Sequence, residues 1–154
     1  MTNVLIIYDS KTGNTETMAK AIKKGADSIN NIIVQMIKLG TPFPISMLNE
    51  VDAIILGSPT HYANVTVEMR NFLGAIKDLT ESEKLKLKNK IGAVFGSYGW
   101  DGGWNLQKLE FELKDLGLII EHPIVESVDA PNERVLMDCT NLGKNIAQKV
   151  LEQH

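Results

Sequence analysis

The sequence of 154 residues contains a single cysteine, Cys139, and no long hydrophobic run. One cysteine excludes an intrachain disulfide and fits a reducing compartment. Because a membrane-spanning helix needs about 20 consecutive apolar residues, the sequence offers no candidate span. The first residues also lack the basic and apolar regions of a secretory leader. These absences predict a cytoplasmic protein.

An excess of charge of one sign is also missing. The 16 Lys and Arg residues nearly balance the 19 Asp and Glu residues, which gives a net charge of −3. So small a charge provides no electrostatic reason to bind nucleic acid or an anionic membrane. The hydrophobic content of 44% and charged content of 23% are ordinary for a globular domain. We expect one domain over residues 1–154 and a monomer.

Apolar runs alternate along the chain with stretches of helical spacing. Runs that predict buried strands occupy residues 4–7, 32–37, 52–57, 91–95 and 118–128. Helical spacing is found over residues 18–29, 65–76, 104–116 and 135–150. Pro123 in the last run favours an edge strand, and residues 78–90 are interpreted as a solvated connection. The pattern predicts an α/β, doubly wound parallel sheet with helices on both faces.

In such sheets a ligand binds beyond the carboxyl ends of the strands. The loop after the first run, residues 8–15, combines hydroxyl, glycine and asparagine residues before a helix. Free backbone N–H groups at a helix N-terminus favour a phosphate-sized anion. The sequence has neither G-x-G-x-x-G nor G-x-x-x-x-G-K-[ST], which disfavours dinucleotide and nucleoside triphosphate loops. The alternative is a plain helix cap at Asn14 or Thr15.

Aromatic residues make up only 6% of the chain, yet several follow the predicted strands. Tyr62 lies in the loop of residues 57–64, and Tyr98 and Trp100 lie in the loop of residues 96–103, next to Trp104. Aromatic side chains beside an anion loop indicate a flat ring stacked between them, with its phosphate in the first loop.

Together the three loops resemble those of flavodoxins, with S-x-T-G-N-T at residues 10–15 for the phosphate of FMN. The run at residues 90–100, K-I-G-A-V-F-G-S-Y-G-W, is similar to short-chain flavodoxins of anaerobic bacteria and to the FMN domain of flavodiiron proteins. The resemblance covers the whole chain, including residues 128–133. It implies a flavodoxin-like three-layer sandwich, a five-stranded parallel sheet in the order 2-1-3-4-5, and FMN as the cofactor.

The resemblance also implies which residues bind FMN. The candidates are Ser10, Lys11, Thr12, Gly13, Asn14, Thr15, Ser58, Pro59, Thr60, His61, Tyr62, Ser97, Tyr98, Gly99, Trp100, Gly102 and Gly103. Trp100 matches the tryptophan that stacks on the flavin ring in short-chain flavodoxins. The alternative is that Trp100 covers the sheet edge without contacting a ligand. Trp104 either packs on the core or joins the rim. Lys11 is expected to point to solvent rather than neutralise the phosphate.

The middle loop departs from the flavodoxin pattern. Many flavodoxins have a glycine there, followed by an acidic residue, and its peptide flips when the flavin is reduced. Residues 61–63 are His-Tyr-Ala, and a non-glycine residue resists a positive φ by about 1 kcal/mol. We therefore expect a hindered flip and a less stable one-electron-reduced flavin. His61 either couples to the flavin charge or is simply exposed.

The resemblance implies a carrier that shuttles low-potential electrons between protein partners, which dock transiently at the flavin edge. Acidic residues around the rim, Asp101, Glu126, Asp129 and Glu133, are candidates for that docking. The middle loop also resembles FMN-dependent NAD(P)H:quinone oxidoreductases, which gives an alternative function. The chain lacks the acidic pair of a phosphoacceptor receiver domain, and the spacing of its histidines predicts no metal site.

Overall fold

The computed structural model describes residues 2–153. Its elements in chain order are β1 (Thr2–Tyr8), α1 (Asn14–Asp27), β2 (Ile32–Lys38), the short 3₁₀ helix η1 (Ile45–Asn49), β3 (Ala53–His61), β4 (Asn64–Val65), α2 (Val67–Glu81), β5 (Ile91–Tyr98), α3 (Trp104–Asp115), β6 (Val125–Val128) and α4 (Glu133–Glu152).

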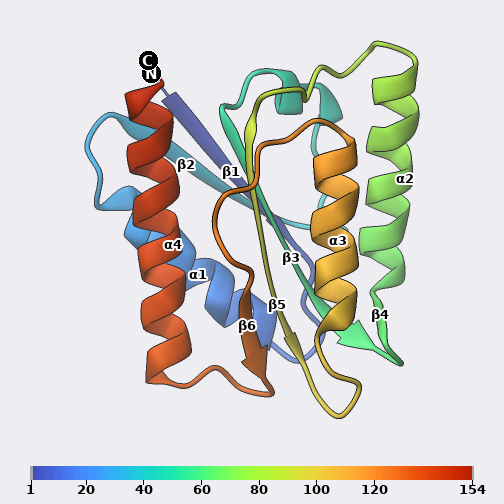
Figure 1. Ribbon diagram of the computed structural model, residues 1–154, viewed down its shortest axis with the longest axis vertical. Coiled ribbons are helices and arrows are strands. Elements are labelled where there is room, and N and C mark those ends of the chain that lie inside the picture. The colour runs from blue at the N-terminus through green and yellow to red at the C-terminus, as the bar shows by residue number, and fades with distance from the viewer. Residues whose placement is uncertain (1, 154) are drawn as a thin grey trace.

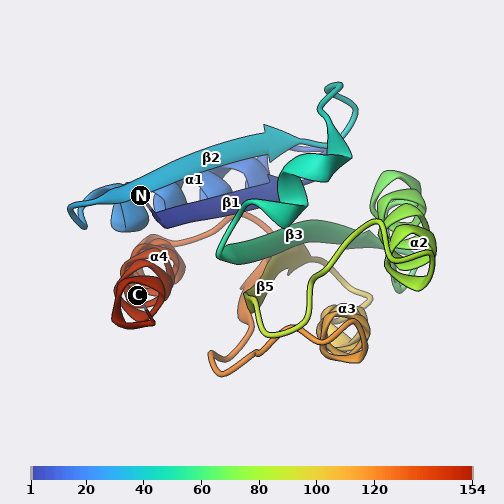
Figure 2. The same ribbon diagram turned by 90° about the horizontal axis from the view of Figure 1, so that it is seen from above.

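A parallel sheet in the order β2-β1-β3-β5-β6 forms the middle layer (Figure 1). The short strand β4 pairs antiparallel with the end of β3 and lies off this path. Helices α1 and α4 cover one face of the sheet, and α2 and α3 cover the other (Figure 2). The predicted sandwich and strand order are confirmed, with β5 and β6 as the fourth and fifth parallel strands.

The central strands are apolar on both faces because both faces are covered by helices. In β1, Leu5 and Ile7 point to the core under α2 and α3, whereas Val4 and Ile6 point to the core under α1 and α4. All four side chains are almost completely buried. This packing fixes the register of β1 and therefore the position of the loop that follows it.

Two segments differ from their predicted structure. The connection after α2 is not simply solvated, because Leu85 and Leu87 are 3% and 1% exposed and belong to the core. The predicted strand over residues 118–128 is reduced to β6 and one isolated bridge between Ile91 and Ile119. Pro123 lies between these two parts, and proline cannot donate to a strand ladder.

Helix α4 buries the only cysteine against the sheet. Cys139 is fully buried, as the sequence predicted. Burial, and secondly the charge of Asp138, raise the pKa of its thiol to about 12. None of the helices within residues 2–153 is both long and apolar enough to cross a bilayer.

We predict that the Cys139 thiol is inert in the folded protein. Because only the thiolate reacts, DTNB at about pH 8 should label native protein at least a hundredfold more slowly than protein unfolded in guanidinium. Absorbance of the released thionitrobenzoate measures both rates. Equal labelling rates would show that α4 does not protect this thiol.

Candidate functional site

The three loops identified in the sequence meet at the carboxyl ends of β1, β3 and β5, at the lower end of the molecule in Figure 1. They enclose a cleft of about 350 Å³, which is in the size range of small-molecule sites. Its lining consists of Thr12, Asn14, Pro59, Thr60, His61, Tyr62, Ser97, Tyr98, Gly99, Trp100, Asp101 and Asp129.

The first loop leaves backbone donors free at the start of α1. Gly13, at a φ of 95°, is the N-cap and has no side chain with which to cap the helix. Ser10 Oγ instead accepts hydrogen bonds from the N–H groups of Gly13 and Glu16, both at 3.2 Å. The N–H groups of Asn14 and Thr15 have no acceptor among residues 2–153. Neither Asn14 nor Thr15 is therefore the N-cap, and the loop has free donors that can receive an anion.

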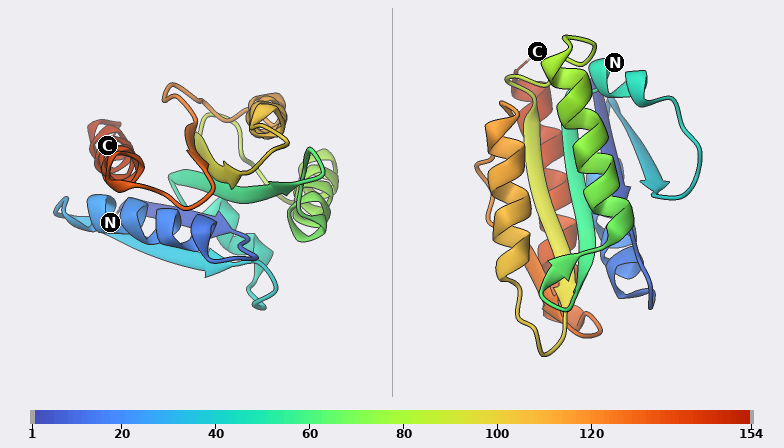
Figure 3. Two further views of the ribbon diagram at one scale, coloured as in Figure 1. Left: turned by 90° about the horizontal axis from the view of Figure 1, so that it is seen from below. Right: turned by 90° about the vertical axis from the view of Figure 1, so that its right-hand side faces the viewer.

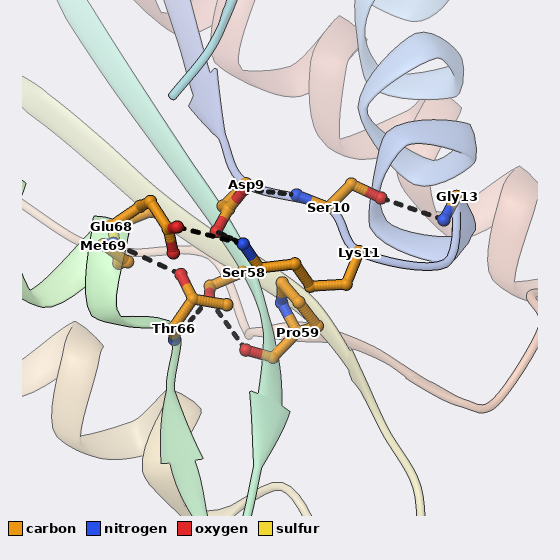
Figure 4. A network of polar contacts seen from close by, with 9 residues as sticks. All are labelled: Asp9, Ser10, Lys11, Gly13, Ser58, Pro59, Thr66, Glu68 and Met69. Carbon is orange, nitrogen blue, oxygen red and sulfur yellow. Dashed lines mark hydrogen bonds and ion pairs between the residues drawn. The ribbon is translucent and has the colours of Figure 1, made fainter. Parts of the chain in front are cut away.

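Lys11 is held away from the exposed amides. Its Nζ lies 3.1 Å from Glu68 Oε1 and 3.6 Å from Asp9 Oδ2. Figure 4 shows this side chain extending toward the two carboxylates, whereas Ser10 Oγ points the opposite way toward Gly13. The hydrogen bond to Glu68, together with the charge of Asp9, raises the pKa of Lys11. Lys11 is therefore paired with acidic residues and is not simply solvated.

The second loop is a tight hairpin between β3 and β4. His61 pairs with Asn64, so Tyr62 and Ala63 alone reverse the chain. Their φ values are 51° and 60°, and a left-handed non-glycine residue costs about 1–2 kcal/mol. Both residues therefore adopt a positive φ despite this cost. The predicted weak stabilisation of one-electron-reduced flavin stays a prediction, as does any coupling to His61.

Asp101 lies in the third loop and connects that loop to the β3–β4 hairpin. Its Oδ2 accepts hydrogen bonds from Thr60 Oγ1 and the Ala63 N–H, each at 2.9 Å. Its Oδ1 accepts one from the Gly99 N–H at 3.3 Å. Burial disfavours the carboxylate, but these hydrogen bonds outweigh burial and lower the pKa of Asp101. The group is therefore a carboxylate at neutral pH.

The aromatic residues of the loops differ in exposure and position. Tyr62 and Trp100 line the cleft with 88% and 86% of their surface exposed. Trp104 is 58% exposed and does not line the cleft, so it packs neither in the core nor against the site. Burial, and secondly the charge of Glu126, raise the pKa of Tyr98. Tyr62 and Trp100 are thus the aromatic faces available to a ligand.

Seven other predicted residues do not line the cleft: Ser10, Lys11, Gly13, Thr15, Ser58, Gly102 and Gly103. Thr15 Oγ1 lies 2.9 Å from Ser97 Oγ and joins α1 to β5. A side chain at Gly103 would overlap the Tyr98 ring. The cofactor-binding prediction did not include Asp101 and Asp129, which line the cleft. In the sequence, the only sign of such a role was their position: Asp101 lies within the glycine- and aromatic-rich loop, and Asp129 follows the last predicted strand.

Comparison with known proteins identifies the family. Residues 6–143 match the family model described as Flavodoxin. The chain belongs to the flavodoxin family. A solved flavodoxin from the domain Archaea superposes on it with a TM-score of 0.85 and 33% identity, covering 97% of this chain and 99% of that one.

Two curated relatives are longer proteins. A putative diflavin flavoprotein A 4 of Synechocystis sp. is 33% identical over 150 residues, which is 96% of this chain and 24% of the relative. The chain spans about a quarter of the length of such diflavin relatives. An NAD(P)H dehydrogenase (quinone) of Paracoccus denitrificans is 31% identical over 141 residues, covering 78% of this chain and 67% of the relative.

FMN is the cofactor that flavodoxin membership implies, and the residues present fit it. The unpaired amides of Asn14 and Thr15 at a helix N-terminus suit its phosphate. Trp100 and Tyr62 offer faces for its flat ring, and the cleft joins these features. A cleft that combines helix N-terminal donors with aromatic faces suits an anion attached to a planar group.

Proposed function

We propose that this protein is an electron carrier that binds FMN in the cleft and exchanges low-potential electrons with protein partners. The observation that supports this most strongly is the cleft itself, which is lined both by Asn14 at the start of α1, whose amide is free, and by the exposed Trp100 and Tyr62. The bound flavin supplies the redox chemistry, whereas the protein supplies binding, orientation and electrostatics.

Each loop has a distinct part in this proposal. The amides of Asn14 and Thr15 and the hydroxyl of Thr12 bind the phosphate. Trp100 and Tyr62 cover the ring and exclude water from its faces. Redox partners dock transiently at the same rim, where these aromatic residues are exposed. We further propose that the carrier works as a monomer in the cytoplasm.

An FMN-dependent NAD(P)H:quinone oxidoreductase is the second candidate. It is favoured by the non-glycine hairpin at Tyr62 and Ala63 and by the similarity to the quinone-reducing relative of Paracoccus denitrificans. The two functions differ in their need for a nicotinamide substrate, which an electron carrier does not use directly.

Absorption spectroscopy and steady-state assays test both functions. The purified protein should be yellow, or become so with added FMN, and should not oxidise NADH or NADPH in the presence of a quinone. Turnover that requires both nicotinamide and quinone would support the oxidoreductase and contradict the carrier. A protein that fails to take up FMN would contradict both.

We predict that Lys11→Met changes the dissociation constant for FMN by less than about threefold, because an exposed ion pair contributes little and Lys11 already faces carboxylates. Flavin fluorescence quenching on titrating apoprotein into FMN measures the constant. Lys20→Met, in the exposed part of α1, is the matched control for loss of one positive charge. A tenfold loss specific to Lys11→Met would show that Lys11 neutralises the phosphate.

A further inference from the structure

We propose that Asp101 is a positioning residue that latches the β3–β4 hairpin to the β5–α3 loop and presets the cleft before the cofactor arrives. This inference rests on the proposed function, because it concerns the same FMN cleft. It adds to the binding prediction a residue, Asp101, that holds the β3–β4 hairpin against the β5–α3 loop.

One carboxylate contacts both walls. Asp101 Oδ1 accepts from the Gly99 N–H in its own loop, at 3.3 Å. Its Oδ2 reaches across to Thr60 Oγ1 and the Ala63 N–H, both at 2.9 Å. The right-hand view of Figure 3 shows the hairpin and the loop next to each other at the lower end of the molecule. The carboxylate thus sets the relative position of the two loops.

The hairpin needs such support because its sequence disfavours its conformation. Two-residue hairpins with both central residues at positive φ usually contain Asn-Gly or Gly-Gly, whereas this one contains Tyr62 and Ala63 at 51° and 60°. The strand that continues it, β4, has only two residues. The hydrogen bond from the Ala63 N–H to the Asp101 carboxylate therefore stabilises Ala63 in its unfavourable left-handed conformation.

Within residues 2–153, side-chain contacts other than those of Asp101 hold the base of the hairpin and not its tip. Thr66 Oγ1 accepts from the Met69 N–H at 3.2 Å and begins α2. Ser58 Oγ accepts from the Thr66 N–H at 3.4 Å. Both lie on the far side of β4 from the turn, so neither replaces the bonds that Asp101 makes to Thr60 and Ala63.

A hairpin held in place lowers the ordering cost of binding. Tyr62 and His61 on the hairpin and Trp100 on the opposite loop line the same cleft. If the hairpin moved freely, the cofactor would have to order it on binding, and affinity would fall. Loss of the Asp101 carboxylate should therefore weaken FMN binding. Its effect on charge alone would be the opposite, because removing a negative charge favours an anionic cofactor.

The test measures FMN affinity in four variants by fluorescence quenching. Asp101→Ala should raise the dissociation constant about tenfold, and Asp101→Asn, which keeps one acceptor oxygen, should raise it less. Adding Ala63→Gly to Asp101→Ala should recover at least about threefold, because glycine adopts a positive φ without strain. Asp115→Asn, which removes the same charge at the end of α3, should change nothing.

A second measurement needs no cofactor. In apoprotein, hydrogen exchange of the Ala63 amide followed by NMR should accelerate at least tenfold in Asp101→Ala and stay unchanged in Asp115→Asn. Unchanged exchange at Ala63, or a loss of affinity that Ala63→Gly does not reduce, would overturn the latch. If the protein bound no FMN at all, the proposed function would fail while this exchange experiment still decided the latch.

Discussion

Trp100→Ala is expected to weaken FMN binding about thirtyfold, because stacking of a flat ring on an aromatic face contributes about 1–3 kcal/mol. The indole is 86% exposed and lines the cleft, so it makes few contacts that the fold itself requires. The free energy of unfolding of the apoprotein should therefore stay almost constant. Titration of apoprotein with FMN, followed by flavin fluorescence, measures the loss.

Trp104→Ala is the matched control. It removes the other tryptophan, which is also exposed but lies outside the cleft, and should change affinity less than about threefold. Trp100→Phe should retain part of the affinity because it keeps an aromatic face. Equal losses for Trp100→Ala and Trp104→Ala would contradict specific stacking of the flavin ring on Trp100.

Gly143→Val is expected to lower the free energy of unfolding by about 3 kcal/mol, since overpacking of a rigid contact costs about 1–3 kcal/mol and occasionally more. Helices α1 and α4 approach backbone to backbone at this point. A Cβ on Gly143 would overlap the backbone of Ile22, and a Cβ on Gly25 would overlap the backbone of Thr140. Neither obstacle is a flexible side chain, so α4 would have to move away from α1.

Urea denaturation measures this effect, and Gly74→Ala provides the opposite control. Gly74 lies in α2, and a Cβ there would meet no atom within 4 Å. Its replacement by alanine should raise stability by about 0.5–1 kcal/mol, because glycine is a poor helix former. A Gly143→Val protein as stable as the wild type would contradict the close packing of α1 on α4.

The first loop was predictable because its signals are local. A buried strand, a short loop with Ser10, Gly13 and Asn14, and an amphipathic helix follow one another within residues 4–27. The parallel sheet also followed from the alternation of runs, whereas the order of its strands came from the family resemblance. Local patterns in the sequence were sufficient for the loop and for the kind of sheet, but not for the order of the strands.

The hairpin was not predictable for the opposite reason. Tyr62 and Ala63 have no intrinsic preference for positive φ, and the acceptor that holds Ala63 lies 38 residues later in the chain, at Asp101. The buried Leu85 and Leu87 were also missed, because their charged neighbours gave the segment a solvated pattern. In both segments the structure depends on contacts with residues far away in the sequence.

The central claim is that one cleft binds both the phosphate and the flat ring of FMN. Parallel titrations of apoprotein with FMN and with riboflavin, which lacks the phosphate, test it most directly. We predict one FMN per chain and at least tenfold weaker binding of riboflavin, because charge-assisted hydrogen bonds at the start of α1 are lost. Equal affinities, or no binding of either flavin, would contradict this account.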